Sequence, residues 1–340
     1  MILAILVTGG TGFIGSHTVV ELVNTGEQVI VLDNFINSSP KVVDSLKNIL
    51  GDSFKFYKGD CCNVNFLEKV FKENEIDAVI HFAGLKAVGE SVKLPLKYYD
   101  SNLSCTIALL NVMAKFECCR FIFSSSATVY GDVNEVPFVE DMPKKSVNPY
   151  GETKIIIERI LQDLCFSNLK FSAVCLRYFN PIGAHKSGFL GDLPIGKPNN
   201  LMPYIVQVAS GKLSCLKVFG NDYAETKDGT GVRDYIHVVD LSLGHVSALN
   251  FCRNHVGFEV FNLGTGVGYS VLEVISSFER VTGMKIKFQI VGRRPGDVAQ
   301  CYCNPKKAKQ MLHWQAKLGL DRMCLDSWNF AKIAYNGLNY

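Results

Sequence analysis

The sequence predicts an α/β protein whose main domain is a doubly wound parallel sheet, followed by a smaller C-terminal α/β domain. Short apolar runs rich in β-branched residues alternate with helical patterns through the first half of the chain. Strands that are apolar on both sides and alternate with helices lie in parallel sheets that helices cover on both faces. The first apolar run leads directly into a glycine-rich turn and then a helical pattern, which is the first unit of such a sheet.

The individual elements follow from the same patterns. We expect strands at residues 2–7, 28–32, 54–57, 78–82, 120–123 and 171–176, and helices at residues 14–24, 65–74, 99–114 and 151–164. Glycine, proline and asparagine become dense at residues 181–231, which predicts long ligand-contacting loops. Ser270 and Glu273 have the spacing of a capping box. Asp321 is expected to cap the last helix.

Length alone indicates about two domains or one large α/β unit, and the composition is that of a globular protein. The chain has 340 residues, with 48% hydrophobic and 20% charged residues and a formal net charge of +3. We expect residues 1–180, joined by a return segment at about residues 238–262, to form the sheet domain, and residues 181–340 to form the second domain. The longest apolar runs are too short for a membrane span, and no basic cluster suggests a nucleic-acid partner.

The twelve cysteines do not have the spacing of a metal site or a disulfide framework. Cys61 and Cys62 are adjacent, and Cys301 and Cys303 have no second Cys or His pair at zinc-finger distance. Most of the others lie in apolar runs, where a reduced cysteine acts as a small hydrophobic residue. We therefore expect no metal. Free thiols without an export signal predict a cytoplasmic protein.

A glycine-rich turn after the first strand has the pattern of a dinucleotide-binding motif. Gly9, Gly12 and Gly15 are spaced so that the backbone can approach a pyrophosphate at the start of the next helix. Asp33 follows at the end of the second strand, where a carboxylate accepts hydrogen bonds from the ribose hydroxyls and repels a 2′-phosphate. The main domain is therefore expected to be of the Rossmann type and to bind NAD rather than NADP.

A tyrosine and a lysine one helical turn apart form the candidate catalytic pair. Tyr150 and Lys154 share one face of the predicted helix. A nearby ammonium and a positively charged nicotinamide would stabilise a phenolate, so we expect the pKa of Tyr150 to be lowered toward neutrality. Ser124, Ser125 and Ser126 end the preceding strand, at the edge of the sheet where ligands of such folds bind.

These motifs together resemble the signature of the extended short-chain dehydrogenases/reductases, and the chain most closely resembles the UDP-glucose 4-epimerase family. The similarity runs from the first strand to about Asp326. It is carried by the segments at residues 81–91, 123–131, 176–180, 198–204 and 229–237.

The resemblance implies a role for each matching residue. Tyr150 would be the base, Lys154 would hold the nicotinamide ribose, and Ser126 would form a hydrogen bond with the sugar's 4-oxygen. It implies that hydride passes from C4 of the sugar to NAD and returns to the opposite face of a 4-keto intermediate. The residues implied to bind the cofactor are Gly9, Gly12, Phe13, Ile14, Gly15, Asp33, Asn34, Asp60, Cys61, Phe82, Ala83, Gly84, Lys86, Ser124, Tyr150, Lys154, Tyr178 and Phe179.

The resemblance also implies UDP-hexose substrates and a homodimer that packs residues 99–114 and 151–164 against their symmetry mates. Its substrate positions are Lys86, Ser126, Tyr150, Asn180, Asn200, Leu201, Phe219, Arg233, Arg294, Asp297 and Cys301. Cys301 matches the position beside the sugar's C2 substituent, where tyrosine accompanies restriction to plain hexoses. A smaller residue there implies that UDP-GlcNAc and UDP-GalNAc are also accepted. Ser101 departs from the family, in which asparagine is common at that position.

Two other functions fit parts of the sequence. A nucleotide-sugar 4,6-dehydratase shares the fold, NAD and the Tyr-Lys pair, but its elimination step needs carboxylates directly after the catalytic hydroxyl. Here Ala127 and Thr128 follow Ser126. A non-catalytic NAD-sensing protein on the same fold usually lacks the tyrosine or the lysine, and this chain has both.

Overall fold

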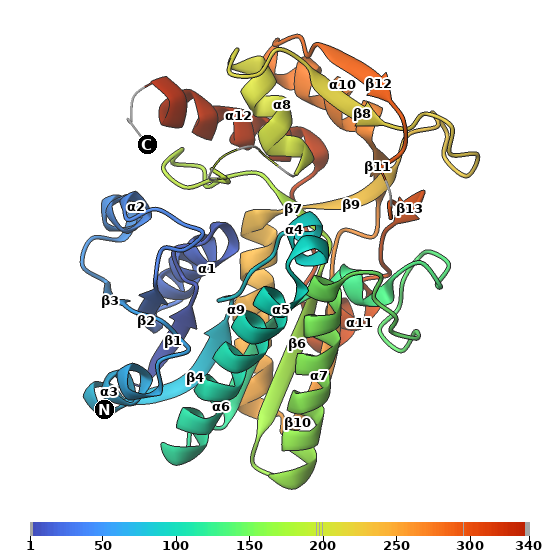
Figure 1. Cartoon of the computed structure of the whole chain (residues 1–340). Coiled ribbons are helices and arrows are strands. Elements are labelled where there is room, and N and C mark those ends of the chain that lie inside the picture. The colour runs from blue at the N-terminus through green and yellow to red at the C-terminus, as the bar shows by residue number, and fades with distance from the viewer. Residues whose placement is uncertain (1–2, 195, 197, 199, 295, 337–340) are drawn as a thin grey trace.

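The main part of the molecule is a parallel sheet with helices on both faces (Figure 1). The computed structural model describes residues 3–194, 196, 198, 200–294 and 296–336. The sheet has seven strands in the order β3-β2-β1-β4-β5-β6-β10. Their bounds are β1 Ala4–Thr8, β2 Gln28–Asp33, β3 Phe54–Lys58, β4 Ile76–His81, β5 Arg120–Ser126, β6 Ser172–Tyr178 and β10 Gly257–Leu263. The strand order reverses at β1, so β1 and β4 form the switch point beside which ligands of such sheets bind.

Alternate residues of each strand enter two hydrophobic cores. Ile5 and Val7 of β1 point to the core shared with α1 (Phe13–Asn24) and α9 (Val238–Asn254). Ala4 and Leu6 point to the core shared with α3 (Val64–Glu73), α6 (Cys105–Lys115) and α7 (Pro149–Ser167). Three further helices lie near the sheet: α2 (Lys41–Leu50), α4 (Val88–Lys93) and α5 (Pro95–Tyr99). This alternation is the reason that the strands read as apolar on both sides.

A smaller part of the molecule lies over one end of the main sheet, at the top of Figure 1. Its strands are β7 (Asn180–Ile182), β8 (Leu216–Phe219), β9 (Val232–His237), β11 (Gly268–Ser270), β12 (Phe288–Val291) and β13 (Gln300–Cys301). Its helices are α8 (Leu201–Ala209), α10 (Val271–Thr282) and α12 (Leu320–Asn336), and the short α11 (Lys306–Met311) follows β13. A separate core that contains Ile205, Phe278 and Met323 joins α8, α10 and α12.

The expected fold class is confirmed, and so is the capping box, in which Ser270 and Glu273 satisfy each other's backbone. One expectation was wrong. The last helix begins at Leu320, so Asp321 lies inside its first turn, and the Asp321 carboxylate accepts hydrogen bonds from Ser277 and Arg280. Residues 181–231 contain the expected loops and, between them, α8 and β8.

The helix expected at residues 99–114 is divided in two. A π-helical turn at Asp100–Ser104 separates α5 from α6.

All twelve cysteines are free thiols. Among the described residues, none of the helices is long and apolar enough to cross a membrane.

Candidate functional site

The turn after β1 is shaped for a close approach of its backbone to a ligand. Gly9 has φ +68°, and a Cβ at this position would lie 2.7 Å from the backbone nitrogen of Ala83. A Cβ at Gly15 would overlap the Gly9 carbonyl oxygen. Gly12 caps α1 without a side-chain hydrogen bond, so the first amides of the helix, at Phe13 and Ile14, point out of its N-terminus. This cradle fits a pyrophosphate.

Carboxylates gather beside this turn at the ends of β2 and β3. Asp33 is buried and accepts hydrogen bonds from the backbone amide of Thr11 (3.0 Å) and that of Phe35 (2.8 Å). The Asn34 amide donates to Asp60 at 3.2 Å. The Asp33 side chain thus fixes the loop after β2 to the glycine turn, where an adenosine ribose would follow a bound pyrophosphate.

Residues 82–84 follow β4 and lie against the same turn. Buried Asn102 positions the segment after them: its side-chain oxygen accepts from the Leu85 amide at 2.8 Å, and its amide donates to Thr153 of α7 at 3.2 Å. Sequence reasoning missed Asn102, although it noted the neighbouring Ser101. Lys86 is exposed at this rim.

The structure brings Tyr150, Lys154 and Ser126 together at the end of β5 and the start of α7. β5 ends at Ser126, and α7 begins with Asn148 as its cap, which accepts from the Gly151 amide at 2.9 Å. The hydroxyl groups of Tyr150 and Ser126 are hydrogen-bonded to each other. The Lys154 ammonium lies 5.5 Å from the centre of the Tyr150 ring and donates to the carbonyl of Ser124 at 2.6 Å.

The expected lowering of the tyrosine pKa is not found in the protein groups alone. Burial raises the pKa of Tyr150 to about 12, although the hydrogen bond with Ser126 acts in the opposite direction. Burial also lowers the pKa of Lys154 to about 8. Burial disfavours both the phenolate and the ammonium, and the ammonium is directed at the carbonyl of Ser124. Lowering the phenol pKa therefore requires a further positive charge beside the ring.

A buried ion pair joins the catalytic helix α7 to strand β6. Glu158 lies one turn after Lys154 and accepts two hydrogen bonds from Arg177 of β6, at 2.9 and 2.8 Å. The Ser125 hydroxyl donates to the same carboxylate at 2.7 Å. Arg177 also donates to the hydroxyl of Tyr130 at 2.9 Å. Sequence reasoning missed this network, although Glu158 has the helical spacing that places it on the face of Lys154.

The end of β6 supplies two more of the predicted cofactor residues. Tyr178 is the register partner of Ser126, and its hydroxyl is hydrogen-bonded to His245 of α9. Phe179 is buried against Phe138. Both residues therefore border the edge of the sheet that carries Ser126.

Four of the predicted substrate residues form one cluster in the smaller part. Arg294 makes two hydrogen bonds to Asp297, at 3.1 and 2.8 Å. Arg233 approaches the same carboxylate at 3.8 Å. The Arg294 guanidinium lies 5.7 Å from the centre of the Phe219 ring. Two guanidinium groups and an aromatic ring are a suitable set for a diphosphate and a base.

Cys301 connects this cluster to the catalytic edge. It is the register partner of Arg233, and it packs against the small core that contains Ala127 and Phe179. Burial raises the pKa of its thiol to about 11, so the side chain is neutral at ordinary pH. The structure thus places a small, uncharged side chain against the core to which Ala127, the residue after Ser126, belongs.

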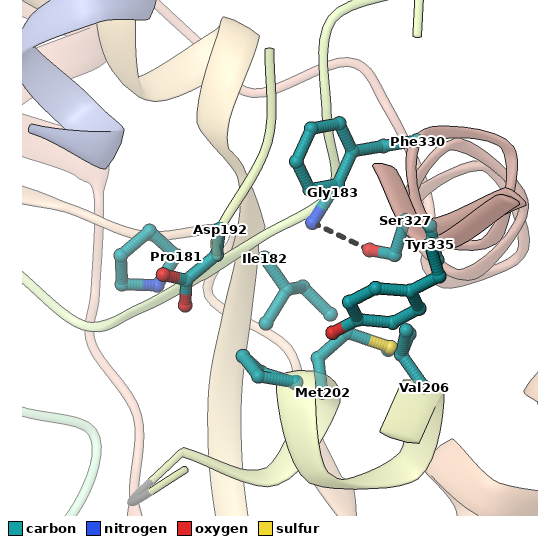
Figure 2. A pocket seen from close by; sticks show the side chains of 11 residues that line it. Pro181, Ile182, Gly183, Asp192, Met202, Val206, Ser327, Phe330 and Tyr335 are labelled. Carbon is teal, nitrogen blue, oxygen red and sulfur yellow. Dashed lines mark hydrogen bonds between the residues drawn. The ribbon is translucent and has the colours of Figure 1, made fainter. Parts of the chain in front are cut away.

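The remaining substrate positions lie near a pocket that β7, α8 and α12 of the smaller part line. Asn180 begins β7, and Asn200 caps α8, which starts at Leu201. The Asn200 side chain is hydrogen-bonded to Asp192, which lines a pocket with Met202, Phe330 and other residues of α8 and α12 (Figure 2). Asp192 was not predicted, because its neighbours are distant in sequence.

The fold and this site together define a nucleotide-binding enzyme of the short-chain dehydrogenase/reductase type. Residues 6–327 match the family model described as GDP-mannose 4,6 dehydratase. The chain is 55% identical over 335 residues to the UDP-glucose 4-epimerase of Bacillus subtilis, with 98% of each chain covered. It is 50% identical to that of Dictyostelium discoideum, over 98% of this chain and 97% of the relative. The chain belongs to the UDP-glucose 4-epimerase family.

Solved structures agree with this assignment. The UDP-glucose 4-epimerase of Stenotrophomonas maltophila, with bound NAD and formylated UDP-arabinopyranose, superposes with a TM-score of 0.96 at 46% identity, covering 99% of this chain and 100% of that one. The enzyme of Bifidobacterium longum, with NAD+ and UDP, gives 0.94 at 50% identity, covering 98% and 100%. The UDP-Glc/GlcNAc 4-epimerase of Campylobacter jejuni gives 0.84 at 35% identity, covering 97% and 99%.

Proposed function

We propose that this protein interconverts UDP-glucose and UDP-galactose by NAD-dependent epimerisation at C4. The observation that carries the proposal is the hydrogen-bonded pair Tyr150 and Ser126, with Lys154 one turn away, at the same sheet edge as the glycine turn. Relatives at 50 to 55% identity are named for this reaction.

The described residues fit NAD. The cradle at Gly9 and Gly15 accepts no Cβ, and the α1 amides are available to a pyrophosphate. Asp33 supplies a carboxylate at the ribose position, with the two backbone amides that it binds holding it in place. When bound, NAD supplies a hydride acceptor and, after reduction, the hydride donor. The reaction has no net oxidation, so one cofactor can serve many turnovers.

The protein groups move and hold the proton. Tyr150 takes the proton of the sugar's 4-hydroxyl, while Ser126 donates a hydrogen bond to the same oxygen. Lys154 would hold the ribose of a bound NAD, whose nicotinamide charge would supply the positive potential that the buried phenol needs. Returning the proton from Tyr150 completes the cycle on the epimeric sugar.

The cluster around Asp297 holds the nucleotide half of the substrate. Arg233 and Arg294 share Asp297, so a diphosphate can take one fork of each guanidinium while the carboxylate keeps the arginines aligned. Phe219, Asn180, Asn200, Leu201 and Lys86 complete the site on the rim between the two parts. Because the nucleotide is held, the 4-keto sugar alone can rotate, so that the hydride returns to the opposite face of its C4.

We extend the proposal to the N-acetylated pair, UDP-GlcNAc and UDP-GalNAc. Cys301 is small and packs against the core that contains Ala127 and Phe179, where a tyrosine would fill the space that an acetamido group needs. The 35% identical relative from Campylobacter jejuni is named for both kinds of sugar, which supports the extension.

A 4,6-dehydratase is the function that the family model's description would suggest. Its elimination needs carboxylates after the catalytic serine, yet Ala127 and Thr128 occupy the short 3-10 helix that follows Ser126. We therefore place the protein with the epimerases. The homodimer through residues 99–114 and 151–164, the cytoplasmic location and the domain division at residue 180 stay predictions.

Two measurements test the proposal. The nucleotide released from the purified protein by denaturation should be NAD, and NADP would contradict the assigned role of Asp33. The protein should then convert both UDP-galactose and UDP-GalNAc to their 4-epimers. Conversion of UDP-galactose alone would confine the activity to plain hexoses.

A further inference from the structure

Three thiols meet beside the loop where Asp60 is expected to contact the cofactor. Cys61 and Cys62 lie in the turn between β3 and α3, and Cys105 is the first residue of α6. The Cys105 thiol has hydrogen-bond contacts with the thiols of both Cys61 and Cys62. The proposed epimerisation uses neither Cys62 nor Cys105, so this cluster needs another explanation.

The environments of the two outer thiols differ. Cys62 is exposed, and its hydrogen bond with Cys105 lowers its pKa against the opposing carboxylates of Asp60 and Asp100. Cys105 is buried, and its pKa is raised by its hydrogen bonds with Cys61 and Cys62 and by burial. An accessible thiol with a lowered pKa beside a second, buried thiol is the arrangement found in redox-sensing pairs.

We propose that Cys62 and Cys105 are a reversible peroxide-sensitive thiol pair. The Cys62 thiolate attacks one oxygen of hydrogen peroxide, and the oxygen–oxygen bond breaks. A sulfenic acid forms, and the hydroxide that leaves becomes water by taking up the proton that the Cys62 thiol released on ionisation. The Cys105 thiol then attacks the Cys62 sulfur, losing its proton, and the sulfenic oxygen leaves as a second water. Two electrons pass from the thiol pair to the peroxide, and a dithiol reductant reverses the change.

Cys62 is a better first target than its neighbour Cys61. Cys61 is only 4% exposed and packs in the core with α3 and α6, whereas Cys62 faces solvent. Reaction with a dissolved peroxide requires access, so oxidation begins at Cys62.

The disulfide would alter the cofactor site. Asp60 accepts a hydrogen bond from the Cys62 backbone amide at 2.8 Å and one from Asn34 at 3.2 Å. A covalent bond is shorter than a thiol contact, so it draws the turn at Cys62 toward α6 and displaces Asp60 and Cys61. Both are expected to contact NAD, and this step rests on the proposed function. Oxidation is thus expected to weaken retention of the nucleotide.

The pair itself is tested by mapping disulfides. The purified protein with its bound nucleotide is treated with hydrogen peroxide, the remaining thiols are alkylated, and the digested peptides are analysed by mass spectrometry. We expect a peptide pair linked through Cys62 and Cys105 that dithiothreitol separates. Cys62→Ser and Cys105→Ala should each abolish it, whereas Cys215→Ser, a partly exposed thiol of the smaller part, should not. A link through Cys61 instead, or none, would overturn the pair.

The functional consequence has its own readout. Oxidised wild-type protein should release its nucleotide about tenfold faster, which is the effect of losing one ordinary hydrogen bond. Cys62→Ser should release it at the unoxidised rate after the same treatment. A mapped Cys62–Cys105 link with unchanged release would overturn the coupling. Protein that holds no nucleotide but still forms the link would instead contradict the proposed function.

Discussion

The Lys154 ammonium donates a 2.6 Å hydrogen bond to the main-chain carbonyl of Ser124, two residues before Ser126. This bond ties the first turns of α7 to the end of β5. Because Tyr150 lies one turn earlier on α7, the same bond sets the distance between the two catalytic hydroxyls. The position of the general base therefore depends on a contact between helix and strand, as well as on the spacing within the helix.

Tyr150→Phe removes only the hydroxyl that takes the proton. We expect NAD and UDP-sugar binding to be retained while turnover falls about 10²- to 10⁴-fold, the usual contribution of a general base. Steady-state rates together with the nucleotide content of the purified variant test this. A variant that epimerises at close to the wild-type rate would rule out Tyr150 as the base.

The buried Lys154 predicts a stability that changes with pH. Its pKa is lowered from 10.5 to about 8, so below pH 8 folding keeps an ammonium in an unfavourable site. Between pH 8 and 10.5 the unfolded chain binds the proton more tightly, so the folded state gains about 3 kcal/mol as pH rises. Lys154→Met lacks this gain.

Urea unfolding of both proteins, freed of nucleotide, at several pH values from 7 to 10.5 measures the effect. Wild type should gain stability relative to Lys154→Met across this range. A difference that stays constant with pH would show that the lysine keeps its ordinary pKa in the folded protein.

Replacing one partner of the buried ion pair between Glu158 and Arg177 should lower the stability of the folded protein strongly. Both side chains are nearly inaccessible, at 0% and 2% exposed. Arg177→Met leaves the carboxylate without its main partner and should destabilise the protein by about 3 to 5 kcal/mol. Thermal or urea unfolding measures this loss.

The same helix provides a matched control. Arg159 and Asp163 form an exposed ion pair on α7, 70% and 61% exposed. Arg159→Met should cost less than about 1 kcal/mol, because water and salt already screen this pair. Equal losses for Arg159→Met and Arg177→Met would contradict the structural role given to the buried pair.

Cys301→Tyr tests the basis of sugar selection. The tyrosine ring should fill the space against the core that contains Ala127 and Phe179, and the overpacking should cost about 1–3 kcal/mol, or roughly 5- to 150-fold in rate, for the N-acetyl sugars. Activity on UDP-galactose should be largely unchanged. Parallel assays on UDP-galactose and UDP-GalNAc give the comparison, and equal losses on both would place the selective residue elsewhere.

Most of the main sheet was predictable because its strands are buried on both faces. Ile5 and Leu6 enter different cores, so the run reads as continuously apolar. The helix α8 was missed because it lies within the glycine-, proline- and asparagine-rich residues 181–231, yet Pro203 lies in the first turn of this helix, where proline is tolerated. The helix α2 was also missed, although Val42, Leu46 and Ile49 have the spacing of an amphipathic helix.

Some residues of the candidate site were predictable from the sequence and others were not. Tyr150 and Lys154 were predictable because their spacing is local. Asn102 and Asp192 were not, since Asn102 contacts Leu85 and Thr153, and Asp192 contacts Asn200, only in the folded chain. Burial alone raises the pKa of Tyr150, an effect that the sequence does not show, and the expected lowering depends on the nicotinamide charge as well as on Lys154.

The most direct test of the proposed epimerisation uses UDP-galactose with deuterium at C4. The account predicts that UDP-glucose forms and keeps the deuterium at C4, because the hydride taken from this carbon returns to it, and that free NADH does not accumulate. Formation of a 6-deoxy-4-keto sugar with deuterium at C6, or no reaction of the nucleotide-bound protein, would contradict it.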